Sequence, residues 1–415
     1  MDSSGSGNSP TLRSSSPSTT STFIPTPSTS ASGNTALPGL GQPTPPLPTV
    51  PSGPLPVTDL STTSWRTEYP RIGQFAMTES EEIIAAVPSG LLHFKRVRDH
   101  ASKPWSEGRL LPDTAMLNDS AVSGLSAFLM RPDNDNSYLC VHCVSGGTLH
   151  NFYRCTKDGS SWVKDSHSPF SEHPIGGTPA VAPSDGYYSS RQWPLVVPCQ
   201  SGGLLHTSTT GPLSSSPYYG ERMRWEPVDH VAKDLGIISS VSIALIDPNI
   251  IIGQDSLKKT VVVAVCVAGG RLHTVEGEFS QNSSVYYLSS LKWQAQAPTR
   301  ILHPGEVTGN PTLTRNISGD QLDLLVPSAE GGIFHFVRTA STPDEWHMIA
   351  RIGFPQGLPA ASCLAIHSGA PYKTRQFRAL IQSGGRLYYV TTTEGSKPWS
   401  GSYLQPVVSP GPFSG

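Results

Sequence analysis

Six histidine or tyrosine side chains and six tryptophans recur along the chain in a fixed order. Each His or Tyr follows a glycine turn, and a Trp comes 11 or 12 residues later in four copies and 19 or 20 later in two. The residues are His93, His150, His206, His273, His335 and Tyr388, followed by Trp105, Trp162, Trp225, Trp293, Trp346 and Trp399. Imidazole and phenol groups form hydrogen bonds, and indole rings cover apolar surface. The pattern fits either a repeated ligand contact or a repeated structural role.

The segments around these residues form an internal repeat of 53 to 67 residues. Its copies read VPSGLLHFKR, VSGGTLHNFYR, QSGGLLHTST, VAGGRLHTVE, AEGGIFHFVR and QSGGRLYYVT. Apolar, β-branched runs precede the turns at Glu82–Val87, Tyr138–Val144, Pro194–Gln200 and Thr260–Val267. Glycine supplies the positive φ that a tight hairpin needs. Each copy therefore predicts a β-hairpin, with the six His or Tyr residues at equivalent positions.

A further apolar strand is expected before each hairpin. The candidates are Ile72–Thr78, Val122–Met130, Thr178–Ala182, Ser239–Ile246, Pro311–Thr314 and Ala360–Ile366, and Tyr403–Val408 is expected to supply or flank a closing strand. Four antiparallel strands at this period are the unit of a β-propeller. We therefore predict an all-β fold, a six-bladed β-propeller over residues 61–415.

Residues 1–60 have a different composition. Ser, Thr, Pro and Gly fill 41 of these 60 positions, and the only charged residues are Asp2, Arg13 and Asp59. Such a segment buries too little apolar surface to offset its ordering entropy. We predict a disordered tail, which serves as a passive linker or as a site for protein partners.

Charge and hydropathy exclude several classes of partner. The net charge is −2, so no strong field favours nucleic acid. No run of 18 apolar residues is present, and we expect no membrane span. The N-terminus lacks a basic region followed by an apolar one, which favours a cytoplasmic protein, with unconventional secretion as an alternative.

The cysteines do not predict a metal site. Cys140 and Cys143 have the spacing of a zinc ligand pair, but positions i and i+3 of a strand point to opposite faces. Cys143, Cys199 and Cys266 each lie three residues before a glycine turn, which indicates small packing positions with free thiols. We therefore expect no metal and no cofactor.

Catalytic motifs are absent from the sequence. It contains no Gly-x-Ser-x-Gly, no His-Glu-x-x-His and no phosphate-binding loop. The segment from Thr156 to Trp162 is one residue shorter than the Asp box of sialidases and occurs once. We therefore predict that the protein is not an enzyme.

The Gly-Gly-x-Leu-His repeat with its downstream Trp resembles the six-bladed fucose-specific lectins of fungi. That resemblance implies sugars between neighbouring blades, held by an Arg before the turn, a Glu after it and aromatic rings. Here Arg378 matches the Arg, whereas His residues occupy most of the Glu positions. The resemblance implies glycans or glycoproteins as partners, with Arg378 and the recurring His, Tyr and Trp residues as candidate contacts. The alternative is a non-catalytic protein-interaction scaffold that no longer binds sugar.

Overall fold

The computed structural model describes most of the chain beyond residue 72. It covers 73–78, 80–96, 105–106, 108–114, 117, 122–131, 137–156, 161–182, 193–212, 223–246, 259–281, 288–294, 298–316, 321–339, 342, 345–354, 358–368, 377–391 and 404–407. These residues all belong to one compact unit, Val50–Gly415. The predicted tail, residues 1–60, and Trp399 lie outside the described residues, so the tail stays a prediction.

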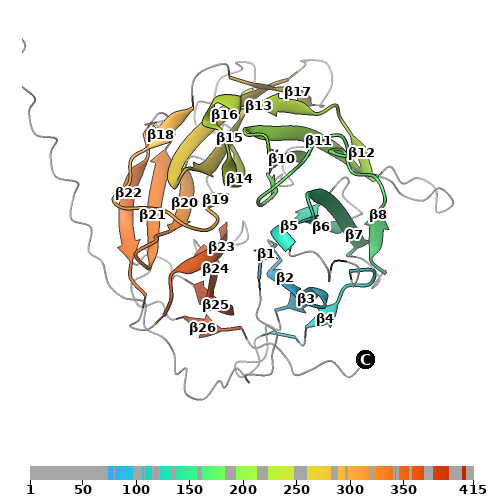
Figure 1. Ribbon diagram of the computed structural model, residues 1–415, viewed down its shortest axis with the longest axis horizontal. Coiled ribbons are helices and arrows are strands. Elements are labelled where there is room, and N and C mark those ends of the chain that lie inside the picture. The colour runs from blue at the N-terminus through green and yellow to red at the C-terminus, as the bar shows by residue number, and fades with distance from the viewer. Residues whose placement is uncertain are drawn as a thin grey trace, which may run out of the picture. The chain divides into compact units, whose positions relative to one another are not determined.

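Six antiparallel sheets are arranged in a ring around a central axis, which confirms the predicted six-bladed β-propeller (Figure 1). Blade 1 has β1 (Phe75–Met77), β2 (Glu82–Val87), β3 (Gly90–Lys95) and β4 (Arg109–Leu110). Blade 2 has β5 (Val122–Met130), β6 (Tyr138–Ser145), β7 (Thr148–Cys155) and β8 (Val163–Asp165). Blade 3 has β9 (Ala180–Val181), β10 (Trp193–Pro198), β11 (Leu204–Pro212), β12 (Met223–Trp225) and β13 (Asp229–Val231).

The second half of the ring repeats this plan. Blade 4 has β14 (Ile238–Ile246), β15 (Lys259–Ala268), β16 (Arg271–Gln281), β17 (Leu288–Trp293) and β18 (Thr299–Ile301). Blade 5 has β19 (Thr312–Arg315), β20 (Gln321–Pro327), β21 (Ile333–Thr339) and β22 (His347–Ile352). Blade 6 has β23 (Ala361–Ser368), β24 (Phe377–Ser383), β25 (Arg386–Thr391) and β26 (Gln405–Pro406). A short 3-10 helix, Lys233–Leu235, follows β13, and the described residues contain no α-helix.

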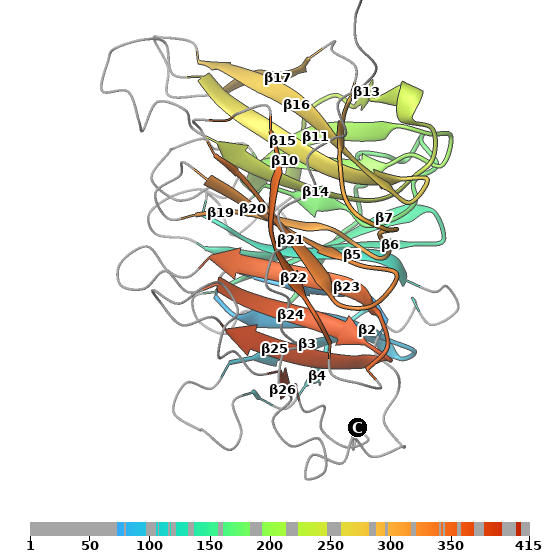
Figure 2. The same cartoon turned by 90° about the vertical axis from the view of Figure 1, so that its left-hand side faces the viewer.

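Each blade comes from one continuous stretch of sequence, so the ring closes between blade 6 and blade 1 through side chains. The hydrophobic core is divided among the interfaces between neighbouring sheets. At the interface between blades 4 and 5, for example, Val263 and Val265 pack against Leu322 and Leu324. The side view in Figure 2 shows these twisted sheets packed face to face. Every sheet thus presents one face to the preceding blade and the other to the following blade.

The recurring His and Tyr residues are not structurally equivalent, and that prediction was wrong. Blades 2, 4 and 6 turn through two glycines, as in the pair Ser145↔Thr148, whereas blades 3 and 5 need five residues, as in Pro198↔Leu204. Ser145 stands one residue before Gly146, whereas Pro198 stands four residues before Gly202, so the pairing register relative to the glycines shifts by three residues. Because side chains alternate along a strand, a shift by an odd number of residues moves every side chain to the other face.

The shift gives the blades two alternating classes. His93, His206 and His335 share the face that packs on the following blade, together with Leu91, Leu204 and Ile333. His150, His273 and Tyr388 face the preceding blade, because Leu149, Leu272 and Leu387 pack on the following one. The innermost strands alternate as well, since β5, β14 and β23 each carry a β-bulge at a serine: Ser123, Ser239 and Ser362. The ring is therefore built from three pairs of blades.

Candidate functional site: the blade interfaces

The described tryptophans of the repeat share one position. In four cases the neighbour is a polar side chain on the third strand of the preceding blade, whereas Trp225 lies near His142 on β6, the second strand of blade 2. The contacts are Trp162 with His93, Trp293 with His206 and Trp105 with Tyr389, with ring centres 5.4 to 5.9 Å apart, and the hydrogen bond from Trp346 Nε1 to Thr274 Oγ1 at 3.1 Å. All except Trp105 are half-buried rather than buried. Among the described residues, five of the interfaces thus combine a tryptophan with a polar side chain of the preceding blade.

The interface between blades 1 and 2 brings opposite charges together beside its tryptophan. Glu82 opens β2, and its Oε2 lies 2.5 Å from His93 Nε2 and 2.8 Å from Arg154 Nη2 of the next blade. The Arg154 guanidinium lies 5.4 Å from the centre of the Trp162 ring. Burial opposes the charge on Glu82, but the His93 hydrogen bond and the nearby cations outweigh it and lower the carboxyl pKa. Burial also lowers the pKa of His93, so the ion pair here is Glu82 with Arg154.

The interface between blades 4 and 5 has the same composition. Arg338 Nη1 lies 2.5 Å from Glu276 Oε1 across the interface, and the guanidinium lies 6.0 Å from the centre of the Trp346 ring. Glu276 is 24% exposed, whereas Arg338 is buried. Nε of Arg338 and Nε of Arg154 have no hydrogen-bond partner in the described part of the chain. Each interface thus combines a partly accessible carboxylate with an arginine that can still donate.

The interface between blades 6 and 1 carries two arginines around one carboxylate. Glu81 Oε1 lies 2.7 Å from Arg378 Nη1 and accepts a hydrogen bond from the Tyr389 hydroxyl at 3.0 Å. Glu81 Oε2 lies 3.6 Å from Arg96 Nε, and the Arg96 guanidinium lies 4.4 Å from the Tyr389 ring centre and 5.4 Å from that of Trp105. Arg378, predicted from the sequence, therefore does lie at a blade interface, where it pairs with Glu81 of the next blade.

The other interfaces show fewer charges among the described residues. Between blades 2 and 3, the buried His142 stacks on Phe128 and bonds to Asn151 Oδ1 at 2.7 Å, near Trp225. Between blades 3 and 4, His206 lies at the edge of Trp293, 3.9 Å from an Asp229 carboxylate oxygen. Between blades 5 and 6, His335 is wholly buried and bonds to Asp323 at 2.9 Å. His335 is therefore part of the core in this structure.

Sequence reasoning missed most of the charged partners. Glu81, Glu82, Arg96, Arg154, Glu276 and Arg338 were not predicted as site residues. A signal for the arginines was present, because the repeats HFKR, HNFYR and FHFVR all carry Arg shortly after the His. The acidic partners lie at different positions of their repeats, so no such signal marks them.

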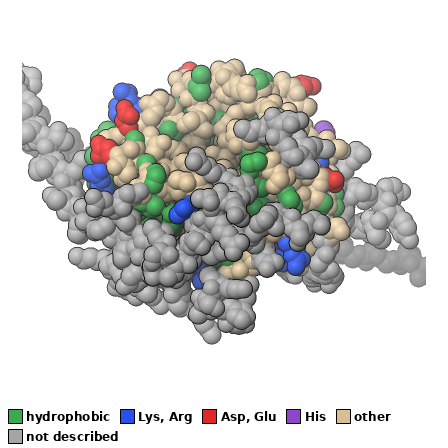
Figure 3. Space-filling model, turned by 60° about the horizontal axis from the view of Figure 1, so that its bottom comes forward, with side chains coloured by type: hydrophobic (Ala, Val, Ile, Leu, Met, Phe, Trp, Pro, Cys, Tyr) green, Lys and Arg blue, Asp and Glu red, His purple; other side chains and the backbone are tan. Residues whose placement is uncertain are grey.

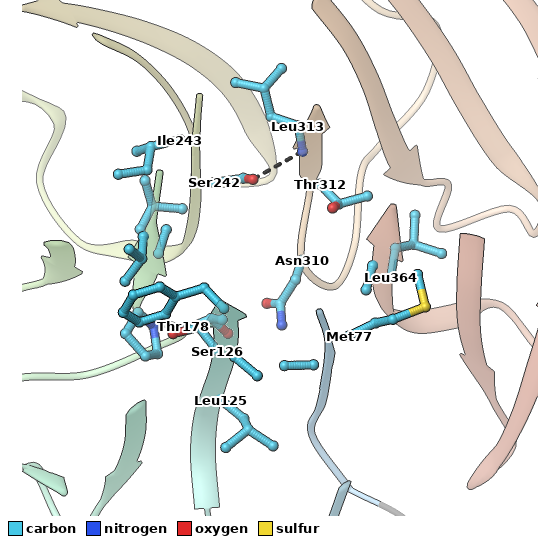
Figure 4. Close-up of a pocket in the computed structure, with 18 of the residues that line it drawn as sticks. Met77, Leu125, Ser126, Thr178, Ser242, Ile243, Asn310, Thr312, Leu313 and Leu364 are labelled. Carbon is cyan, nitrogen blue, oxygen red and sulfur yellow. Dashed lines mark hydrogen bonds between the residues drawn. The ribbon is translucent and has the colours of Figure 1, made fainter. Parts of the chain in front are cut away.

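A cavity of about 140 Å³ lies on the ring axis, lined by the innermost strands of the blades. Figure 4 shows Asn310 near its middle, with Ser126 and Thr178 nearby, and the hydrogen bond from Leu313 N to Ser242 Oγ at 2.9 Å. The described residues that line this cavity include no Asp, Glu, Lys, Arg or His. The charged chemistry of the described residues therefore lies at the blade interfaces and not on the axis.

The cysteines pack as small core residues. Cys140 and Cys143 lie in different interface clusters, so their side chains point to opposite faces of β6 as predicted. Burial raises the pKa of Cys143 and Cys266 to about 12, which keeps both thiols protonated. Within the described ranges, no three His, Cys, Asp or Glu side chains are grouped so that they could hold a metal ion.

Hydrophobic segments were also searched for membrane spans. Among the residues that the structure describes, no helix has both the length and the apolar character that crossing a bilayer requires.

We expect the two buried histidines, His142 and His206, to make stability fall in mild acid. Burial holds the pKa of each at about 4, against 6.5 for an unburied imidazole. Between these values the unfolded chain binds protons that the folded chain does not, so folding weakens as pH falls from 6.5 to 4. Each residue contributes up to about 3 kcal/mol to this loss. Urea unfolding at pH 7, 6 and 5 measures it.

The controls for this pH dependence are single substitutions. His206→Asn should make the stability profile between pH 7 and 5 less steep by about half, because one of the two buried imidazoles is gone and His142 remains. His347→Gln, at a half-exposed position, should leave the profile unchanged. Parallel profiles for the wild type and His206→Asn would contradict the prediction.

Comparison with solved structures gives several matches at low sequence identity. Aleuria aurantia lectin in complex with Fucα1-6GlcNAc superposes with a TM-score of 0.50 and 12% identity, over 84% of this chain and all of that one. AofleA from Arthrobotrys oligospora gives 0.48 and 12%, over 83% and 88%. The α-L-arabinanase of Penicillium chrysogenum gives 0.45 and 12%, over 78% and 93%.

Comparison with protein-family models gives no match, and comparison with curated protein sequences gives none. The structural likeness therefore concerns architecture. Aleuria aurantia lectin is described as a six-bladed β-propeller with a fucose recognition mode of its own. What this chain shares with that lectin is its fold, the six-bladed β-propeller.

Proposed function

We propose that the chain is a carbohydrate-binding protein that holds sugars at its blade interfaces, with fucosylated glycans as the first class to test. The observation that carries this proposal is the group of Glu, Arg and half-buried Trp at two interfaces, Glu82–Arg154–Trp162 and Glu276–Arg338–Trp346. Sugars present hydroxyls on their edges and C–H groups on one face. Charged side chains hydrogen-bond strongly to the hydroxyls, and an indole ring covers the C–H face.

The partial exposure of the two Glu–Arg–Trp groups favours small ligands, or the exposed ends of larger ones. Glu82 opens β2, Arg154 and Arg338 stand next to the last residues of β7 and β21, and Glu276 lies midway along β16. Glu82 is 13% and Glu276 is 24% exposed. The two interfaces are three blades apart and therefore lie on opposite sides of the ring (Figure 1). Two weak sites on one rigid body raise the overall affinity for a surface that carries many copies of the ligand.

We also propose that this binding is not catalytic. Glycoside hydrolysis generally requires two carboxyl groups placed on either side of the bond that breaks. At these two interfaces the described ion pairs contain one carboxylate each, and it is already held by an arginine. Such a carboxylate suits hydrogen bonding to hydroxyls better than proton transfer.

The test is glycan binding by the full chain and by variants. We expect the wild type to bind fucosylated glycans on an array and methyl α-L-fucoside in calorimetry. Arg154→Gln and Arg338→Gln should each remove one class of site, because a charge-assisted hydrogen bond contributes about 1.5–3 kcal/mol, or roughly 10- to 100-fold in affinity. The double variant should not bind fucosylated glycans or methyl α-L-fucoside.

The matched control is Arg351→Gln, which removes an exposed arginine that pairs with Glu330 away from the interface groups. Its binding should equal that of the wild type. A blank array from a folded sample would contradict the proposal. The chain would then be better described as a protein-interaction scaffold.

A further inference from the structure

The interface between blades 6 and 1 differs in charge from the other two charged interfaces. At the interface between blades 1 and 2 (interface 1/2), Arg154 pairs with Glu82. At the interface between blades 4 and 5 (interface 4/5), Arg338 pairs with Glu276. At interface 6/1 Arg96 and Arg378 share the single carboxylate of Glu81. The described ion pairs of this interface therefore leave one positive charge unmatched.

Two hydrogen-bond donors at the same interface also have no acceptor. Nη1 of Arg96 and Nε1 of Trp105 are both buried and have no hydrogen-bond partner in the described part of the chain. A buried donor without an acceptor is costly, and more so when it carries charge. Because Glu81 already accepts from Tyr389 and lies beside both arginines, its oxygens are occupied. Among the described residues these donors therefore lack an acceptor, and a negatively charged one would also balance the second arginine.

The arginines are also the accessible members of this group. Arg96 is 23% and Arg378 is 19% exposed, whereas Glu81 is 7% exposed and Tyr389 is buried. Figure 3 turns this side of the ring toward the viewer, and a few isolated Lys or Arg side chains are visible there between the residues drawn in grey. An anion that approaches from solvent thus meets guanidinium groups first.

We infer that interface 6/1 binds an acidic sugar, whose carboxylate would bind Arg96 and Arg378 and whose ring would lie near the aromatic group of Trp105 and Tyr389. The inference rests on the proposed function and deepens it by assigning one interface a ligand of different charge. Guanidinium matches a carboxylate with two parallel hydrogen bonds. The rings of Trp105 and Tyr389 meet edge to face, 5.4 Å apart, and support the Arg96 guanidinium.

The experiment follows the tryptophan indole signals of the ¹⁵N-labelled full chain by NMR. Trp105→Phe assigns the Trp105 signal, and Trp162→Phe assigns that of Trp162. The titrants are methyl β-D-glucuronide, its neutral counterpart methyl β-D-glucoside, sodium acetate and methyl α-L-fucoside. We expect the glucuronide to shift the Trp105 signal, because the sugar ring would lie near its indole, and we expect its affinity to fall as salt is raised.

Two variants connect the shift to the arginines. Arg96→Gln should weaken glucuronide binding at least 10-fold and leave the fucoside response of Trp162 unchanged, and that response also shows that the variant is folded. Arg96→Lys, which keeps the charge but loses the planar fork, should retain part of the affinity.

The outcomes separate this inference from the proposed function. Equal affinity for glucuronide and glucoside, or an unmoved Trp105 signal, would overturn the inference even if the fucoside binds elsewhere. Equal affinity for acetate would overturn the assignment to a sugar. A fucoside that moves no tryptophan signal would count against the proposed function and leave the glucuronide result to be judged by itself.

Discussion

Replacing Glu81 by Gln should destabilise the ring by about 3 kcal/mol or more. The carboxylate is 7% exposed and is the negative partner of Arg96 and Arg378, which belong to blades 1 and 6. Removing one partner from a buried ion pair leaves the other charge without compensation, which costs about 3–5 kcal/mol. Because no strand crosses between these blades in the described structure, this contact is part of what closes the ring. Urea unfolding followed by tryptophan fluorescence measures the loss.

The control uses an ion pair of the same type on the surface. Glu330 pairs with Arg351 at 2.8 Å, but the two side chains are 62% and 41% exposed. Such a pair contributes about 0–1 kcal/mol, so Glu330→Gln should barely move the urea midpoint. Glu81 has a φ of 60°, and Gln inherits the same backbone, so strain does not distinguish the two forms. Equal midpoints for both variants would show that ring closure does not depend on Glu81.

Replacing Asp323 by Ala should be similarly damaging at the interface between blades 5 and 6. Asp323 Oδ1 lies 2.9 Å from His335 Nε2, and Gln321 Nε2 donates to both carboxylate oxygens. Asp323 and His335 are wholly buried. Loss of the carboxylate removes the acceptor of the His335 hydrogen bond and of both Gln321 hydrogen bonds at a buried position, at a cost of about 3–5 kcal/mol. Chemical denaturation at pH 7 gives the change in unfolding free energy.

Asp323→Asn provides the graded comparison. The amide oxygen can still accept from His335 or Gln321, so this variant should lose clearly less stability than the alanine variant. Glu345→Ala, which removes a largely exposed partner of His347, should change stability by less than about 1 kcal/mol. If Asp323→Ala unfolded at the wild-type midpoint, His335 would have to be regarded again as a ligand contact rather than as a core residue.

The strands could be predicted closely because each depends on local sequence. β2 has the bounds that its apolar run indicated, and β5 matches its expected range, Val122–Met130. Period-two alternation and turn residues are contained within a few positions of the chain. The number of blades followed from the repeat, because six blocks of this length leave no room for a seventh.

The faces of the strands could not be predicted in the same way. The Leu-His dipeptide stands at a constant spacing from its glycines, yet His150 and His206 point to opposite neighbours. What decides the face is the pairing partner on the strand before the turn, and that depends on how many residues the turn uses. Ion pairs such as Glu276 with Arg338 join residues 62 positions apart, so they depend on the closed ring rather than on any local pattern.

The alternation of two blade classes limits how such a ring can change in size. In one class of blade the recurring His faces the following blade, and in the other class the recurring His or Tyr faces the preceding blade. Each interface joins one blade of each class. Duplication or loss of a single blade would place two members of one class side by side, with surfaces that have not been matched to each other. Duplication of a pair preserves every kind of junction. Relatives derived from this chain by tandem duplication or deletion should therefore differ from it by even numbers of blades.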